Sequence, residues 1–450
     1  MAFGRSDWRL ATLILAALLW LASLPGGGTA EAAPPPQAEK NFQYTGPGSC
    51  ASSACHGSVR PRGDTRVPQN EYSIWIVQDK HSKAFTQLSN PLSQTIARNL
   101  GMKERPDHAE RCLTCHSLNV PPALQAHTFD PTDGVSCELC HGPASAWLGP
   151  HTTRGWTHAQ SVALGMKETK DLVTRTQVCL SCHLGTAERP MTHEMLAAGH
   201  PDLAFELDSY SAVMPRHWKQ PLDQDPWIDV REWSVGQAAQ LRDSLLQLGR
   251  RARGPQWPEF MEMDCFACHH ALTKSQDSWR QQVGYPGRQP GVPPWSRSRS
   301  IVFQQFLQQI DPGSAGQLGG ALEEVAGDMN QLQPDKDKVA QAADRAAQVA
   351  DQVARELPAY RYDGPSTLRA LRAITQHSDE LGAQERSAEQ AVMAVDSLFL
   401  AYTRKQKVAN QAQVEAAIND LFRQLENPSA YDARRFAESL RRVGALLPGS

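Results

Sequence analysis

All ten cysteines of this 450-residue chain occur in pairs, and a histidine directly follows each pair. Four pairs read C-x-x-C-H (CLTCH, CELCH, CLSCH and CFACH), and the first, CASSACH, has four intervening residues. The cysteines are Cys50 and Cys55, Cys112 and Cys115, Cys137 and Cys140, Cys179 and Cys182, and Cys265 and Cys268. The histidines that follow them are His56, His116, His141, His183 and His269. Two thiols at this spacing can add to the two vinyl groups of one haem, while the next imidazole binds its iron. The sequence therefore predicts five covalently bound haem c groups.

Two other uses of paired cysteines have to be weighed. A C-x-x-C pair can bind zinc, and an even cysteine count in an exported protein can indicate disulfides. Neither requires a histidine after every pair. Histidine makes up 15 of 450 residues, so five such histidines by chance have a probability of roughly 4 × 10⁻⁸. A disulfide across two residues would also be strained and would cross-link little chain.

The sixth ligand of each iron decides what the haem can do. An iron with two protein ligands suits electron transfer, whereas an open position permits substrate binding. Outside the motifs we predict five distal ligands, namely His81, His151, His193, His200 and His270. His193 and His200 share a helical face if one helix spans both. His270 adjoins His269, and adjacent helical residues point about 100° apart, so His270 would serve a neighbouring iron. The weaker candidates are His108, His127, His158 and His217, and His377 is expected at the surface.

The first residues of the chain read as a signal peptide. Arg5 and Arg9 precede a mostly apolar run, 10–24, and a small-residue stretch, GGGTAEAA. A membrane-spanning helix needs about 20 apolar residues, and this run is shorter. An uncleaved membrane anchor is the alternative. We predict cleavage near residue 33, export to the periplasm and no membrane span afterwards. The chain has 45 basic and 48 acidic residues, so it lacks the excess of positive charge that would indicate nucleic acid as a partner. We expect its partners to be redox proteins.

The chain divides into two regions of different composition. Every cysteine, and every histidine except His377, lies between residues 50 and 270, a region with few long periodic apolar stretches. Short helices and loops around haems would have this composition, because the porphyrins supply apolar core. We predict a mainly α fold with little strand: a haem domain at 34–280, a Pro/Gly-rich linker at 281–298 and a helical bundle at 299–450.

Helical periodicity supports the bundle. Apolar residues recur at helical spacing at Val339, Ala342, Ala346, Val349, Val353 and Leu357, and again at Val414, Ile418, Leu421 and Leu425. Pro358 ends the first helix, and Asn427-Pro428-Ser429 separates the second from a last helix near 431–446. Two roles stay open for this bundle: a docking or oligomerisation module, or a lid packed on the haem domain.

From Cys50 to about His200 the chain resembles the multihaem cytochromes of the cytochrome c-554 group, relatives of the hydroxylamine oxidoreductase haem arrangement. The resemblance rests on CASSACHGS, DKHSKAF, RCLTCH, GVSCELCHGPASAWLGPH and VCLSCH, in that order. A subset found among environmental bacteria extends it through HEMLAAGHPDLAFE, MPRHW, WSVGQ and WPEFMEMDCFACHHAL. It covers roughly residues 45 to 272.

The resemblance implies ligands residue by residue. His151 would close the haem of His56, and His81 would serve the haem of His141 or His183. A further ligand would come from His193 or His200. The family's second haem, here that of His116, is open on its distal side, and His127 could fill that position. Two features depart from the family: the widened first motif, and a fifth motif that four-haem members lack.

Three functions are compatible with this pattern. The favoured one is an exported carrier that transfers electrons through five mostly bis-His haems. The alternative is an oxidoreductase acting on nitrite, nitric oxide or hydroxylamine at an open iron, although no C-x-x-C-K motif of ammonia-forming nitrite reductases occurs. The third is an electron-transfer subunit whose bundle docks it to a respiratory complex. The sequence favours a carrier over an enzyme without deciding between them.

Overall fold

The computed structural model describes residues 42–65, 67–269 and 292–449. The predicted signal peptide, His270 and most of the predicted linker lie outside these ranges. Residues Met1–Phe42 and Gln43–Ser450 form separate units, and the second contains all the described helices. The described residues of this second unit form α-helices and 3-10 turns, with isolated bridges at Tyr44–Gln125 and Met263–Trp295 in place of strands. The prediction of a mainly α fold is confirmed.

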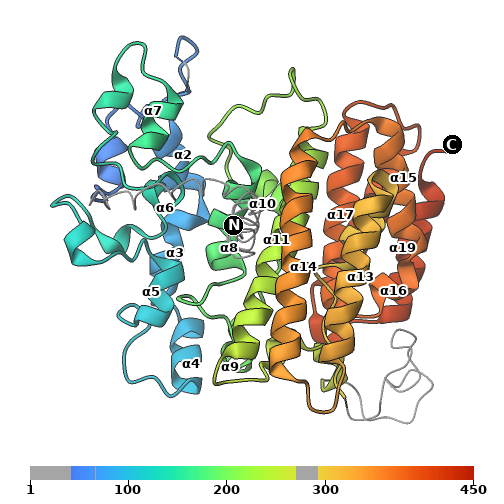
Figure 1. Ribbon diagram of the computed structural model, residues 1–450. Helices are drawn as coiled ribbons and strands as arrows, with labels where there is room; N and C mark the ends of the chain where they lie inside the picture. Colours follow the sequence, from blue (N-terminus) through green and yellow to red (C-terminus); the bar gives the residue numbers. More distant parts are fainter. Residues whose placement is uncertain (1–41, 66, 270–291, 450) are drawn as a thin grey trace, which may run out of the picture. The chain divides into compact units, whose positions relative to one another are not determined.

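The first half of this unit consists of short helices joined by long loops (Figure 1). Its α-helices are α2 (Glu71–Gln78), α3 (Ala84–Gln87), α4 (Pro91–Asn99), α5 (Glu110–His116), α6 (Cys137–His141), α7 (His158–Ala163), α8 (Leu172–His183), α9 (His193–Ala197) and α10 (Leu207–Val213). Its 3-10 turns are η1 (Pro47–Cys50), η2 (Lys80–Lys83), η3 (Pro122–Leu124), η4 (Pro131–Asp133) and η5 (Pro150–Thr152). Most of these elements are too short to be stable alone, so their positions depend on tertiary contacts.

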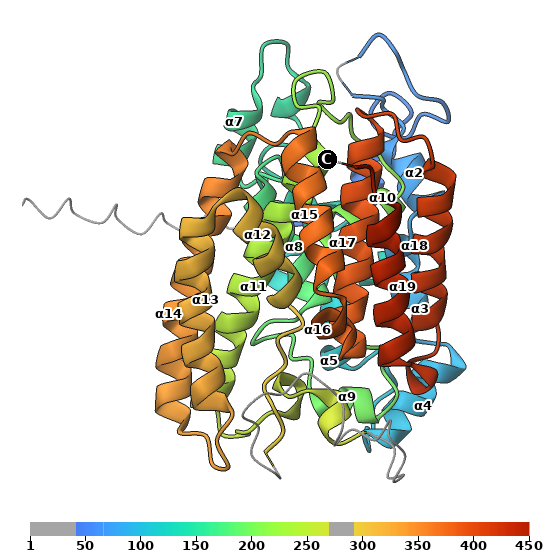
Figure 2. The same cartoon turned by 90° about the vertical axis from the view of Figure 1, so that its right-hand side faces the viewer.

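Long helices dominate the rest (Figure 2). They are α11 (Ile228–Arg253), α12 (Ile301–Ile310), α13 (Pro312–Met329), α14 (Lys336–Glu356), α15 (Gly364–Gln376), α16 (Ser378–Gly382), α17 (Glu385–Thr403), α18 (Gln411–Leu425) and α19 (Ala433–Leu446). The 3-10 turns here are η6 (Phe260–Glu262), η7 (Cys265–Ala267), η8 (Leu357–Ala359) and η9 (Pro428–Ala430). As the periodicity indicates, α14 ends just before Pro358, and η9 separates α18 from α19.

One buried core crosses the boundary that the sequence places between haem domain and bundle. Helix α11 packs along α14 and also touches α12 and α17. Trp233 of α11 is fully buried, and its ring lies 4.7 Å from that of Phe306 of α12. Small residues on α14, such as Ala343 and Ala350, are fully buried and allow close helix packing. By packing, the helical half therefore begins at α11, although the domain boundaries themselves stay a prediction.

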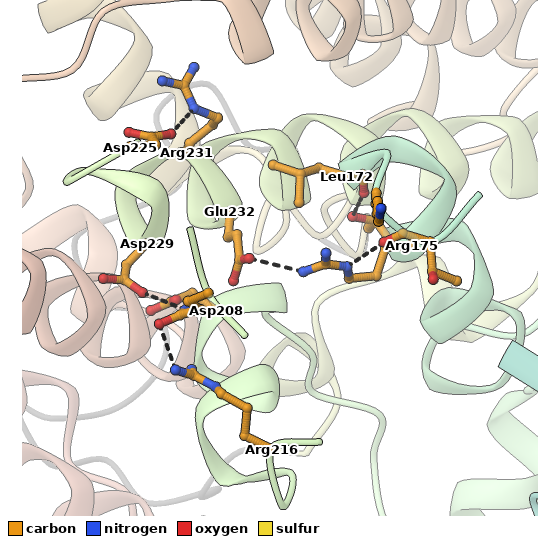
Figure 3. Close-up of polar contacts among 12 residues, drawn as sticks. Leu172, Arg175, Asp208, Arg216, Asp225, Asp229, Arg231 and Glu232 are labelled. Carbon is orange, nitrogen blue, oxygen red and sulfur yellow. Dashed lines mark hydrogen bonds and ion pairs between the residues drawn. The ribbon is translucent and has the colours of Figure 1, made fainter. Parts of the chain in front are cut away.

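Helix α11 also holds the motif-bearing half in place. It packs against α8, which ends in the fourth Cys-Cys-His motif, and against α10. Arg175 of α8 donates to Glu232 of α11 at 2.9 Å, and both side chains are largely buried (Figure 3). Because α11 contacts both halves, the position of the fourth motif is tied to the packing of the bundle.

Candidate haem-binding sites

The motif histidines stand at the ends of short helices. His116, His141 and His183 are the last residues of α5, α6 and α8, and His269 follows η7. In these helices the two cysteines of a motif are three residues apart, which places both thiols on one face. All ten cysteines are free of disulfides.

The widened first motif reaches a similar arrangement without a helix. Residues 53–56 form a turn, and the backbone N–H of His56 donates to the carbonyl of Cys50 at 3.1 Å. A second bond, from the N–H of Cys55 to the carbonyl of Ser52 at 2.8 Å, folds the extra residues back on themselves. The loop thus absorbs the two extra residues while keeping Cys50 next to His56.

Each motif histidine faces one histidine from elsewhere in the chain. The ring centroids of the five pairs are 6.2–6.5 Å apart. The pairs are His56 with His151, His81 with His183, His116 with His200, His141 with His217, and His193 with His269. The partners lie in or beside short elements: η2, η5, the two ends of α9 and the loop after α10.

This spacing fits a metal ion held between two imidazoles. An iron about 2 Å from a nitrogen of each ring keeps the two ring centroids roughly 6 Å apart. Stacked rings in direct contact can approach more closely than this, to centroid distances of about 4.5 Å. All five pairs share nearly one spacing although their interplanar angles range from 7° to 88°. A common distance without a common angle favours a bridging atom over ring packing.

The structure brings together four of the five distal candidates with motif histidines. His151 lies opposite His56, and His81 lies opposite His183, one of the two positions that the resemblance offers. His193 and His200 both face motif histidines, not only one of them. His200 stands opposite His116, where the resemblance implies an open position. The fifth candidate, His270, lies outside the described residues.

The fifth pair contains a residue that the sequence pattern ranks low. His217 faces His141 at 6.5 Å, and its own neighbour Trp218 lies edge-on to it at 5.1 Å. The MPRHW segment that carries it was the available signal. His217 is 76 residues from its partner in sequence, so only the tertiary packing of the loop after α10 reveals the pairing.

His193 and His200 face different motifs because their helix stops between them. Helix α9 ends at Ala197, and Gly199 adopts a left-handed backbone with φ of 107°. The condition for a shared helical face, that one helix spans both histidines, is therefore not met. The turn at Gly199 instead directs His193 toward the fifth motif and His200 toward the second.

The remaining described histidines have other surroundings. His108, His127 and His377 are exposed. His158 uses its Nε2 in a 2.8 Å contact with Glu168. In the described part of the chain, none of these four faces a motif histidine, so the suggestion that His127 fills a site beside His116 gains no support.

Hydrogen bonds at Nδ1 orient many of the paired rings. Nδ1 of His56 contacts Glu71 at 2.9 Å, and Nδ1 of His81 contacts Asp79 at 2.9 Å. Other rings contact backbone carbonyls through Nδ1: His116 with Ala84, His151 with Leu148, His200 with Pro201 and His217 with Pro215. An Nδ1 donor fixes the tautomer and leaves Nε2 as the ligand atom.

Burial and charge set the protonation of the paired histidines. Burial lowers the pKa of His141 and of His183 to about 4, so both rings are neutral near pH 7. Burial also lowers the pKa of His116. The carboxylates of Glu71 and Asp79 raise the pKa of His56 and His81, respectively. A neutral imidazole is the form that binds a metal.

The thiols show which motifs are neighbours in space. A hydrogen bond with Cys137 lowers the pKa of Cys50, which places the first and third motifs side by side. A hydrogen bond with Cys115 lowers the pKa of Cys182 to about 6, which places the second and fourth side by side. Helix α8 touches both α5 and α6, so these two pairs of motifs adjoin.

Comparison with known proteins agrees with this geometry. Residues 49–142 match the model of a family described as cytochrome c554 and c-prime. This segment belongs to the cytochrome c554 family. It contains the first three motifs and His81, whereas the fourth and fifth motifs and the bundle lie outside it. No curated protein and no solved structure shows significant similarity to the chain.

The cytochrome c554 assignment indicates a multihaem c-type cytochrome that works in electron transfer and carries covalent haem c. The Cys-Cys-His motifs supply the thioether and axial-ligand chemistry that such a group needs. A search of the described helices for one with the length and hydropathy of a membrane span found none.

Proposed function

We propose that this protein is an exported electron carrier with five haem c groups, each held by a Cys-Cys-His motif and by one further histidine. The observation that carries the proposal is the five-fold recurrence of a motif histidine facing another histidine at 6.2–6.5 Å. The proposed distal ligands are His81, His151, His193, His200 and His217. His270 would then not be needed as a ligand.

Closed coordination favours a carrier over an enzyme. An oxidoreductase that acts on a small nitrogen compound needs an iron with a free position. The candidate for that position was the haem of His116, and His200 faces it at 6.4 Å. With a ligand on both sides of every iron, the protein would exchange electrons without binding a substrate at the metal.

The neighbour relations of the motifs favour one connected path. The first and third motifs adjoin, as do the second and fourth. The fifth is linked to the second through α9, whose two ends carry the partners of His269 and His116. Short edge-to-edge separations would follow from these links, and rapid transfer between haems requires such separations.

Export and partners complete the proposal. The charged start, apolar run and small-residue stretch of residues 1–33 support cleavage and release into the periplasm. The donor and acceptor would be other redox proteins. Helix α11 and the bundle share a core with the motif-bearing half. We therefore propose that the bundle packs on the haem-binding half. Oligomerisation through the bundle is the second candidate role, and measurement of the mass in solution tests it.

Spectroscopy of the purified full-length protein tests the proposal. A pyridine haemochrome assay should give five haems per chain, and the oxidised and reduced spectra should be those of six-coordinate, low-spin iron. Carbon monoxide should leave the reduced spectrum unchanged. A lower haem count, pigment that acidified acetone extracts, or carbon monoxide binding by two or more irons would contradict it.

A further inference from the structure

Two buried carboxylates, Glu206 and Asp208, lie where α10 meets α17. Glu206 is fully buried, and Asp208 is 8% exposed. Glu206 accepts backbone N–H bonds from Asp208 and Ser209, both at 2.7 Å, and the hydroxyl of Ser397 at 3.1 Å. The Glu206 carboxylate therefore covers the first backbone N–H groups of α10, the helix that carries Asp208.

No cation within the described residues forms an ion pair with either acid. Three guanidinium groups nearby have other partners. Arg404 pairs with Asp229, and Arg216 donates to Gln220. Arg175 pairs with Glu232 (Figure 3). The second oxygen of Glu232 is itself buried without a partner. Helix α11 thus adds two further carboxylates to this region and no free positive charge.

Apart from these arginines, the titratable groups around the pair are acidic or neutral. From α17, Glu389 acts on Tyr210, which belongs to the same helix as Asp208. Burial, followed by the charges of Glu206, Asp229 and Glu232, raises the pKa of Asp208 well above its ordinary value. Burial likewise raises the pKa of Glu206. Two neighbouring buried carboxylates cannot both ionise at low cost, so burial and mutual repulsion favour retention of a proton by the pair.

The same turn of chain touches a motif histidine. Phe205 directly precedes Glu206, and its ring stacks on that of His183 at 5.6 Å. Tyr210 lies edge-on to His183 at 5.1 Å, and its ring centroid is 4.9 Å from that of Phe205. The residue directly before Glu206 therefore packs on the imidazole of the fourth motif.

A hydroxyl relay leads from the pair toward the surface. Ser397 lies 3.2 Å from the hydroxyl of Ser209, whose side chain is only partly buried. Ser209 is four residues before Val213, which is 80% exposed. The hydroxyls of Ser397 and Ser209 thus connect the buried Glu206 to a partly exposed side chain.

We propose that Glu206 and Asp208 form a proton-binding site coupled to the redox state of the haem on Cys179 and Cys182. The inference rests on the proposed function, because it needs a haem iron at His183. One electron from the redox partner converts that iron from ferric to ferrous, and one proton from water enters the carboxylate pair. Reoxidation returns the electron to the acceptor and the proton to water. The coupling is electrostatic, because loss of one positive charge at the iron strengthens proton binding by nearby acids.

The test is a spectroelectrochemical titration of the intact holoprotein between pH 5.5 and 8.5. We expect the midpoint potential of one haem to fall as the pH rises through the range in which the pair titrates. Asp208→Asn removes one acid and its repulsion, so this pH dependence should move to lower pH. The double variant Asp208→Asn with Glu206→Gln should abolish it. Reduced-minus-oxidised infrared spectra should show a protonated carboxyl band in the wild type that both variants lose.

The matched control is Asp396→Asn. Asp396 is the neighbour of Ser397 on α17, and its pKa is raised by burial and by Glu415 of α18. This variant should keep the pH dependence and the infrared band. Should the double variant misfold, Ser397→Ala removes the hydroxyl that donates to Glu206 and should shift the same band. A pH-independent wild type, or an unchanged infrared band in Asp208→Asn, overturns the inference. A wrong haem count in the wild type would instead contradict the proposed function.

Discussion

The imidazoles of His56 and His151 lie parallel, with 7° between their planes and 6.3 Å between their centroids. Replacing His151 by Ala should leave one of five irons without its second axial ligand. The visible and electron paramagnetic resonance spectra should then show one high-spin haem and four low-spin haems. An unchanged spectrum would remove His151 from the set of ligands.

His158→Ala is the matched control for that experiment. His158 lies seven residues further along the chain, but its Nε2 contacts Glu168. It should leave all five irons low-spin, because no motif histidine faces it in the described part of the chain.

His200 faces the motif histidine whose haem the resemblance to the cytochrome c-554 group implies to be open. It faces His116 at 6.4 Å, and the Nδ1 of each ring contacts a backbone carbonyl. We expect His200→Ala, unlike the wild type, to bind one carbon monoxide per reduced chain, because the variant exposes one iron. Titration with carbon monoxide, followed in the Soret band, measures the stoichiometry. If the wild type already binds one equivalent and the variant binds no more, His200 is not a ligand.

The ligand pairs show which parts of such a site a sequence can reveal. Local spacing identifies every motif histidine, because thioether chemistry fixes the distance between two cysteines and a histidine. Spacing says nothing about His217, which reaches His141 only through the loop after α10. Family motifs close part of this gap, as for His81 and His151, but only where the family pattern extends.

The fold divides in the same way. Amphipathic periodicity locates α14 and α18 to within a few residues, because each buries one face. The same periodicity gives no clear signal for α11, which is buried around most of its circumference. A helix that is covered on all sides lacks a polar face. Composition alone therefore gives no sign that α11 packs against both halves.

Glu71 is predicted to tune the haem of the first motif. Its carboxylate contacts Nδ1 of His56 at 2.9 Å, and a carboxylate acceptor makes an axial imidazole a stronger electron donor. A stronger donor stabilises ferric iron, so Glu71→Gln should raise the midpoint potential of one haem. The rise should be roughly 40–90 mV, equivalent to about 1–2 kcal/mol for one electron. Redox titration of the holoprotein measures it.

Glu110→Gln serves as the comparison for Glu71→Gln. Glu110 is exposed and opens α5, the helix of the second motif. It removes the same charge near a motif without removing a bond to an imidazole in the described structure. Equal shifts in both variants would show a general charge effect and not control through His56.

Glu389 should make the stability of the protein depend on pH. Burial, then the charges of Glu385 and Asp202, raise its pKa from the ordinary 4.5 to about 7. A carboxyl whose pKa is raised by folding favours the folded state only while it is protonated. With respect to Glu389, the folded state is therefore most stable below about pH 4.5. Its stability declines as the pH rises and is lowest above about pH 7.

Glu389→Gln mimics the protonated form at every pH. At pH 8 the variant should be more stable than the wild type by about 1–3 kcal/mol, a range reduced for partial exposure to solvent. At pH 5 the difference should shrink severalfold, because the wild-type side chain is then protonated in the folded state. Urea unfolding of the holoprotein, followed by circular dichroism at both pH values, measures these differences. Glu438→Gln, at an exposed position on α19, should change stability little at either pH. A gain at pH 5 as large as that at pH 8 would mean that the substitution acts through packing and not through the ionisation of Glu389.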